Sequence, residues 1–224
     1  MGDCMPRARF DAQLEQLNDD LKEMATLTET ALMSAVEVLS TRDEAKAREI
    51  IAGDDEIDHQ EREVEGMCLR LLLMQQPVVA GDLRHVGAAL KMVGDLERIG
   101  DQAADIADVV LTLKGDFDSE LNAHLSAMAG RASAMVHEAV GAYVHRDEER
   151  AHAVIGEDDG VNELFERVKL DVINAIKNDE EPAANLVEAL MVAKYLERIG
   201  DHAQNIAEWV EYSVTGLYKG EPLN

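Results

Sequence analysis

The hexapeptide LERIGD occupies Leu96–Asp101 and occurs again, letter for letter, at Leu196–Asp201. At average residue usage, such an identity arises by chance roughly once in a thousand chains of this length. The hexapeptide combines apolar residues at helical spacing with two acids, an arginine and a glycine. It predicts an internal duplication, and its charged residues are the first candidates for a functional site.

The duplication extends well beyond the hexapeptide. Residues 41–58 align with residues 145–162 at a constant offset, and residues 90–110 align with residues 190–210 at a slightly shorter one. Self-similarity at a fixed spacing is the sequence signature of a repeated structural unit. The sequence therefore predicts two homologous repeats, at residues 10–115 and 116–216.

Each repeat is predicted to form three long antiparallel helices, because few β-branched or aromatic runs alternate with the period of a strand and the chain has only four prolines. Pro77 and Gly115 supply stops in the first repeat. In the second, Asp147 opens the middle helix, Pro182 lies in the first turn of the last helix and Gly216 ends it. The predicted helices of the first repeat are residues 11–40, 43–75 and 82–114. The fold class is all-α, with two tandem three-helix bundles.

The third helix of each repeat carries a coiled-coil seam. Leu96, Ile99 and Ala103 are spaced by three and four residues, and the pattern continues to residue 113 and recurs a hundred positions later. With these residues facing the core, Glu97 and Asp101 are placed on the outer face of the helix, four residues apart. We therefore expect a stripe of carboxylates that faces solvent.

The middle helix carries a matching stripe, Asp54, Asp58, Glu61 and Glu65, whose counterparts are Asp158, Asn162, Phe165 and Lys169. Like charges four residues apart destabilise a helix, by about 0.2–0.5 kcal/mol per pair, so a bound cation would offset the repulsion. Carboxylates suit iron, manganese, magnesium or calcium better than a structural zinc, and a plain solvated face is the alternative. The candidate metal ligands are Asp54, Asp58, Glu97, Asp101 and Asp105 in the first repeat and Asp158, Glu197 and Asp201 in the second.

Other residues of the stripes have two interpretations each. Gly100 and Gly200 each cost about 1 kcal/mol relative to alanine within a helix, which implies either a closely packed neighbouring helix or room for a ligand or partner. Arg98 and Arg198 are either ordinary salt-bridge residues or partner contacts. His202 is either a ligand or a surface histidine, and Asn205 replaces the acid found at position 105.

Composition limits the function classes. The net charge of −25 disfavours nucleic acid, anionic lipid and free phosphate as partners, and suits cations or a basic protein, although solubility alone is an alternative. The sequence contains no phosphate-binding loop and no hydrolase or metalloprotease motif, so no enzymatic activity is expected. Two cysteines, no apolar run of eighteen residues and no apolar segment in MGDCMPRARF lead us to expect a cytoplasmic protein without direct membrane insertion.

The chain resembles the PhoU family of phosphate-transport regulators. The resemblance rests on QPVVAGDLRHVGAALK (Gln76–Lys91), DLERIGDQAADIA (Asp95–Ala107) and YLERIGDHAQNIAEWVEYSVTG (Tyr195–Gly216), and it covers nearly the whole chain. It implies two similar three-helix bundles side by side, with metal clusters held on the surface by acid pairs spaced four apart. Asn162 and Asn205 stand where acids are expected, which predicts an incomplete second cluster.

The resemblance also implies a function. It predicts a negative regulator of the phosphate-starvation response, an adaptor between the high-affinity phosphate ABC transporter and a sensor histidine kinase, recruited to the inner face of the membrane. Its metal would be iron or another oxygen-preferring cation, with manganese, magnesium and zinc left open, as is a homodimer. A carboxylate-bridged metalloenzyme or metal store, and a regulator of another transporter or channel, are the alternatives.

Overall fold

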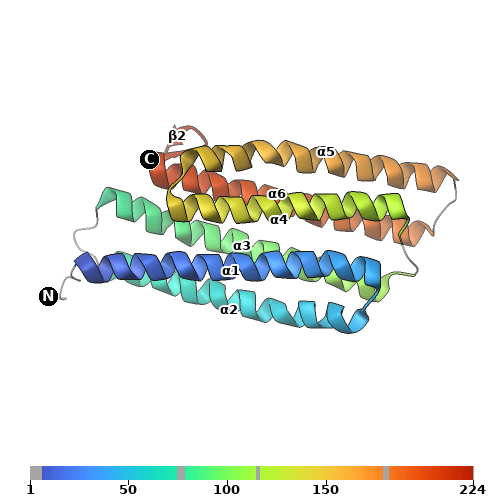
Figure 1. The fold of residues 1–224 in the computed structure, drawn as a ribbon, viewed down its shortest axis with the longest axis horizontal. Helices are drawn as coiled ribbons and strands as arrows, with labels where there is room; N and C mark the ends of the chain where they lie inside the picture. Colours follow the sequence, from blue (N-terminus) through green and yellow to red (C-terminus); the bar gives the residue numbers. More distant parts are fainter. Residues whose placement is uncertain (1–6, 75–78, 115–116, 179–181, 224) are drawn as a thin grey trace.

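The chain folds into six long helices followed by a short hairpin in the computed structural model, which describes residues 7–74, 79–114, 117–178 and 182–223 (Figure 1). The elements are α1 (Arg7–Thr41), α2 (Glu44–Met74), α3 (Ala80–Thr112), α4 (Ser119–His145), α5 (Glu148–Asn178), α6 (Ala183–Thr215), β1 (Leu217–Tyr218) and β2 (Glu221–Pro222). The predicted all-α fold with two three-helix repeats is confirmed.

The helices form two bundles that lie side by side. Helices α1, α2 and α3 pack on one another, and α4, α5 and α6 do the same. The bundles meet where α3 packs on α6 and α1 packs on α4, which leaves α2 and α5 at opposite outer edges (Figure 1). No helix in the described ranges has an apolar stretch long enough to cross a membrane.

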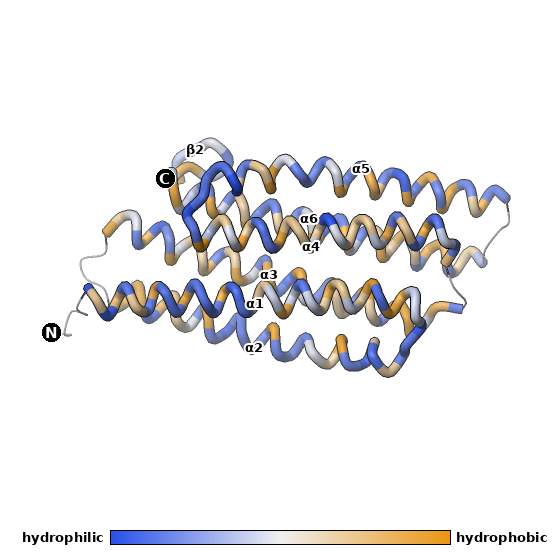
Figure 2. The backbone as a smooth tube through the Cα atoms, in the orientation of Figure 1, coloured by the Kyte–Doolittle hydropathy of each residue, from blue (hydrophilic) through white to orange (hydrophobic). Residues whose placement is uncertain are grey.

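The predicted seam forms the centre of each bundle. Leu96, Ile99 and Ala103 are fully buried, as are their counterparts in α6. Apolar and polar residues alternate along every helix at the helical period, so each helix has one face for the core (Figure 2). Burial of these apolar faces is the main stabilising contribution, at about 25 cal/mol per Å² removed from water.

Side-chain caps fix where two helices begin, and a glycine in the left-handed conformation fixes where α6 ends. Asp43 Oδ1 accepts from the backbone N–H of Lys46 at 3.0 Å, and Asp147 Oδ1 accepts from that of Arg150 at 3.0 Å. Gly216 ends α6 in the left-handed conformation, with φ of 84°. The beginning predicted at Asp147 and the end predicted at Gly216 are therefore confirmed.

The structure departs from the predicted boundaries in several places, and α3 both begins and ends two residues earlier than predicted. Pro182 is the N-cap of α6 rather than a residue of its first turn, because its ψ of 126° is extended. Helix α1 begins four residues earlier than predicted, where Phe10 is buried in the core. A two-residue hairpin was not expected; it forms where Lys219 and Gly220 both have positive φ and Trp209 stacks on Tyr218. Pro77, Gly115 and the predicted repeat boundary lie outside the described residues.

Buried polar contacts hold the two bundles together. Tyr143 of α4 stacks on His85 of α3 with ring centroids 4.2 Å apart, and its hydroxyl donates to the His85 carbonyl oxygen at 3.0 Å. Burial, aided by nearby Arg146, lowers the pKa of His85 to about 4, so this histidine is neutral at physiological pH. The contact fixes α3 against the second bundle, and α3 carries the first hexapeptide.

Candidate metal centre

The acids of α2 and α3 converge in the first half of the molecule. Asp54 and Asp58 lie one turn apart on α2, and Asp101 faces them from α3. One carboxylate oxygen of each lies within 4.8 Å of the others, and all three side chains are half-buried. In the described part of the chain, this is the one group of three acid, cysteine or histidine ligands that meets so closely. Three hard oxygen donors at this spacing are able to coordinate one cation.

Gly100 explains how the two helices come close enough. A Cβ atom at this position would lie 2.9 Å from Ile57 Cδ1 and 3.2 Å from Asp54 Oδ1. Glycine therefore lets α2 approach α3 at the point where the carboxylate of Asp54 packs against the helix backbone. Of the two readings of this glycine, close helix packing is correct.

The charge of the group is costly without a cation. The pKa of Asp54 is raised to about 6 by burial and then by Asp101 and Asp58. The pKa of Glu97 is also raised to about 6, by burial and then by Asp101. Raised carboxyl pKa values mean that the negative forms are disfavoured in the fold, so a bound cation would stabilise them.

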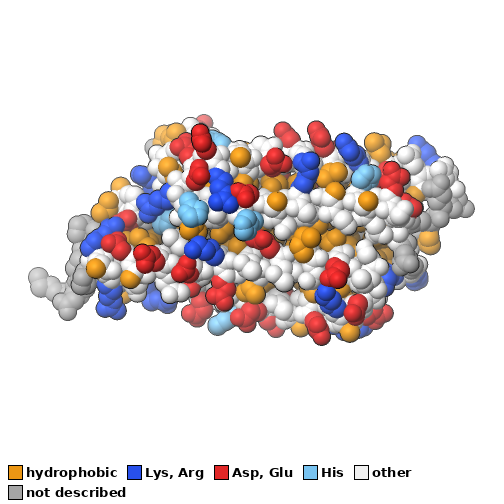
Figure 3. All heavy atoms as spheres, viewed as in Figure 1, with side chains coloured by type: hydrophobic (Ala, Val, Ile, Leu, Met, Phe, Trp, Pro, Cys, Tyr) orange, Lys and Arg blue, Asp and Glu red, His pale blue; other side chains and the backbone are white. Residues whose placement is uncertain are grey.

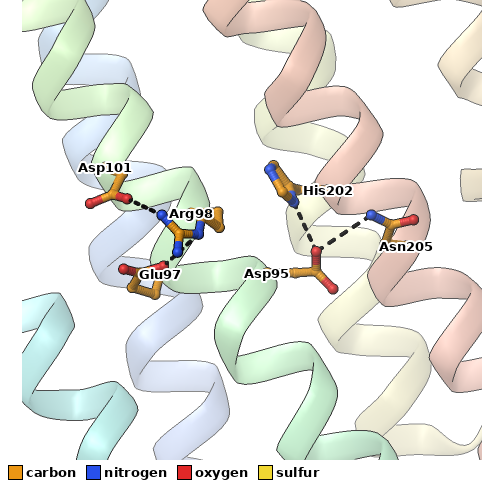
Figure 4. A network of polar contacts seen from close by, with 6 residues as sticks. All are labelled: Asp95, Glu97, Arg98, Asp101, His202 and Asn205. Atoms are coloured by element: carbon orange, nitrogen blue, oxygen red, sulfur yellow. Dashed lines mark hydrogen bonds and ion pairs between the residues drawn. The ribbon is translucent and has the colours of Figure 1, made fainter.

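Arg98 closes the outer side of this group. Its guanidinium lies 3.3 Å from Glu97 Oε2 and 3.0 Å from Asp101 Oδ2 (Figure 4). The Arg98 side chain is 59% exposed, so it is free to move aside at small energetic cost. Arg98 therefore forms ordinary salt bridges in this structure. A contact between Arg98 and a partner protein stays a proposal.

The predicted solvent exposure of the acids is only partly correct. Glu97 and Asp101 point away from the α3 seam, but the flank of α2 covers them, so they are half-buried. Asp158, the counterpart of Asp54, is buried at 8% exposure because α5 packs closely against Gly200, with the nearest atoms 3.3 Å from where a Cβ would lie. Asp105 is exposed, and it is not one of the three residues whose oxygens meet. Acidic side chains also gather along the α2 edge of the surface (Figure 3).

The second half builds a different site around the same hexapeptide. Asp158 Oδ2 accepts a hydrogen bond from Asn162 Nδ2 at 2.8 Å, so the amide that replaces Asp58 already occupies it. Glu197 forms a short ion pair with Lys194, the counterpart of Gly94. Phe165 replaces Glu61, and the Lys194 ammonium lies 5.6 Å from its ring centroid. Burial and Glu197 raise the pKa of Asp201, while Lys194 opposes the shift.

The two sites differ most in charge. The first has six carboxylates and two cationic side chains at the positions that surround the hexapeptide, a net charge of −4, because Arg62 pairs with Asp58 at 3.5 Å. The second has four carboxylates and three cationic side chains at the equivalent positions, a net charge of −1, because Glu166 pairs with Lys169 at 2.7 Å. The first set is Asp54, Asp58, Glu61, Arg62, Glu65, Glu97, Arg98 and Asp101 with Gly94, and the second is Asp158, Asn162, Phe165, Glu166, Lys169, Glu197, Arg198 and Asp201 with Lys194. The first site therefore offers a cation more carboxylate donors and more negative charge than the second.

His202 and Asn205 belong to neither site. Both contact Asp95 Oδ1 across the α3–α6 interface, His202 Nδ1 at 2.8 Å and Asn205 Nδ2 at 3.4 Å (Figure 4). Asn205, which the sequence places in the second stripe, therefore contacts the other bundle. The roles of Lys194 and Phe165 were missed, although pairing each position of the stripes with its repeat counterpart would have revealed both.

Comparisons with known proteins agree with this architecture. A PhoU domain family model matches residues 21–110 and 125–210. A Clostridium acetobutylicum protein, a phosphate-specific transport system accessory protein PhoU homolog, is 37% identical over 212 residues, covering 95% of this chain and 97% of that protein. The crystal structure of PhoU from Pseudomonas aeruginosa matches with a TM-score of 0.86 and 32% identity, over 93% of this chain and 100% of that chain. PhoU from Streptococcus pneumoniae matches with a TM-score of 0.86 and 28% identity, over 93% and 98%.

Proposed function

This chain belongs to the PhoU family, and we propose that it acts as an accessory adaptor of a phosphate-specific transport system. The observation that carries the proposal is similarity over the whole helical region to a relative that bears this description. Resemblance at both bundles, rather than at one, supports transfer of the role of the complete protein. The adaptor would act in the cytoplasm, at the inner face of the membrane.

The finer role in this proposal is negative regulation of the phosphate-starvation response. The chain would connect the high-affinity phosphate ABC transporter to a sensor histidine kinase by binding both. A chain with 46 acidic and 21 basic residues has a strongly acidic character that supports binding to basic protein faces and disfavours direct capture of free phosphate. The exposed Arg198 is a candidate contact for such a partner.

The first half would hold an oxygen-preferring cation, such as iron or manganese. Asp54, Asp58 and Asp101 would be its ligands, with Glu97 in reach of the same group. The cation would supply positive charge where the carboxylates repel one another, and so would hold α2 and α3 at a fixed separation. Three converging carboxylates are also the observation that favours the alternative function, a metal store; a store would load several ions per chain, whereas this group supports one.

Deletion of the gene tests the regulatory role. We expect alkaline phosphatase or another phosphate-scavenging activity to rise in phosphate-rich medium and to return to normal with the wild-type gene. Complementation with D54N/D101N then separates the adaptor role from the metal role. Unchanged scavenging activity together with unchanged phosphate uptake after deletion would contradict the proposed function.

A further inference from the structure

The second half contains its own positive charges where the first half has acids or no side chain. Lys194 replaces Gly94, and Lys169 replaces Glu65. Both ammonium groups lie over the ring of Phe165, at 5.6 and 5.5 Å from its centroid. The ring replaces Glu61, which in the first half is 3.9 Å from where a side chain at Gly94 would begin. The substitutions are therefore neighbours in space and change one local environment together.

The contacts of Lys194 place its charge at the carboxylates. Lys194 Nζ pairs with Glu197 Oε2, whose side chain is only 15% exposed. Asn162 satisfies one oxygen of Asp158, so two of the three acids of this site already have a donor from the chain itself. The ring of Phe165 favours cations on its face, which helps to hold both lysines there.

From this geometry we infer that Lys194 replaces a bound cation in the second half, so that only the first half responds to metal. The inference rests on the proposed cation site of the first half. A lysine ammonium supplies one positive charge and three hydrogen-bond donors. Because the side chain is covalently attached to α6, this charge cannot dissociate from the site as a metal ion can. A metal ion entering this site would have to displace Lys194 from Glu197. It would meet three carboxylates and an amide, where the first half has four carboxylates at the equivalent positions.

The test uses manganese binding by the full chain in a background that disables the first site, D54N/D101N. We expect this double variant to bind Mn²⁺ about tenfold or more weakly than wild type. Addition of N162D/F165E/K194G, which recreates Asp58, Glu61 and Gly94 in the second half, should restore one site per chain. If D54N/D101N still binds Mn²⁺ tightly and D201N abolishes that binding, the second half takes metal despite its lysines and the inference is wrong.

A second measurement does not depend on metal binding by either half. In EDTA, K194M should lower Tm by about 2–4 °C, because Glu197 and Asp201 lose their counter-charge. K22M is the matched control, since Lys22 and Asp19 form an exposed ion pair at the same three-residue separation; it should change Tm by less than about 2 °C. K194R should restore wild-type stability. Equal effects of K194M and K22M would overturn the inference, whereas absence of Mn²⁺ binding by wild type would contradict only the metal part of the proposed function.

Discussion

The two copies of LERIGD have the same letters, the same buried seam and different chemistry. Around the first copy the charged side chains are mostly acids, whereas the side chains around the second copy include an amide, an aromatic ring and lysines. Packing constrains the residues inside the hexapeptide, because both copies must fit between their neighbouring helices. Charge is determined by residues on the adjacent helix and one turn earlier, which packing leaves free to change. A repeated motif thus identifies a repeated fold, while its neighbours decide whether the function is repeated too.

Adding or removing metal should give the largest difference between the two halves in metal content and in the free energy of unfolding. At free Mn²⁺ of about 100 times the dissociation constant, binding to the folded state adds about 2.7 kcal/mol to the free energy of unfolding. EDTA should remove this stabilisation from wild type. D101A should abolish it and D201A should leave most of it, as measured by thermal unfolding and elemental analysis. Equal loss in the two variants would show that the difference in charge does not control affinity.

Alanine at the two glycines should reveal how much tighter the first helix contact is. G100A inserts a methyl group 2.9 Å from Ile57 Cδ1, which costs about 1–3 kcal/mol, partly offset by about 1 kcal/mol of helix propensity. In G200A the nearest atoms lie at 3.3 Å, so propensity should balance the contact. Urea unfolding in EDTA should therefore give a lower stability for G100A than for G200A. A lower stability for G200A than for G100A would mean that α2 shifts to accommodate the added methyl group more easily than α5 does.

Acidification should stabilise the metal-free first half. The folded-state pKa values of Asp54 and Glu97 are raised to about 6, from ordinary values near 4, so the folded chain keeps protons that the unfolded chain has lost. The destabilisation is fully present above about pH 6 and disappears as the pH falls toward 4. After solvent screening, we expect a gain of about 1 kcal/mol in EDTA. A D54N/E97Q variant should lose most of this dependence, and an unchanged pH profile in that variant would assign it to other carboxyls.

Breaking the polar contact between the two halves should have the smallest effect on stability and metal binding. H202A removes the hydrogen bond to Asp95 at 2.8 Å, which contributes about 0.5–1.5 kcal/mol. Because His202 lies outside both acid sites, Mn²⁺ affinity should not change. Isothermal titration and chemical unfolding of the same preparation check both expectations. A lower Mn²⁺ affinity in H202A would connect the interface to the first site.

Sequence patterns predicted the fold better than the site, for a physical reason. The seam through Leu96 and Ile99 is periodic, and burial of an apolar stripe leaves few alternative arrangements. The meeting of the carboxylates between α2 and α3 depends on how closely the two helices approach, which Gly100 permits and the sequence cannot quantify. The rotation of Asn205 toward Asp95 depends on the packing of two bundles, and no pattern within one repeat contains that information.

Helices α2 and α5 lie at opposite edges of the molecule, so the acid-rich site and its less acidic counterpart lie toward opposite edges as well (Figure 1). The two halves as wholes are similarly acidic, so the difference is local to the residues around each hexapeptide. A basic side chain of a partner would therefore be attracted more strongly to the first site than to the second at short range. This attraction weakens as the Debye length falls to about 8 Å at physiological ionic strength. Two nearly identical folds thus give a basic partner two unequal places to bind.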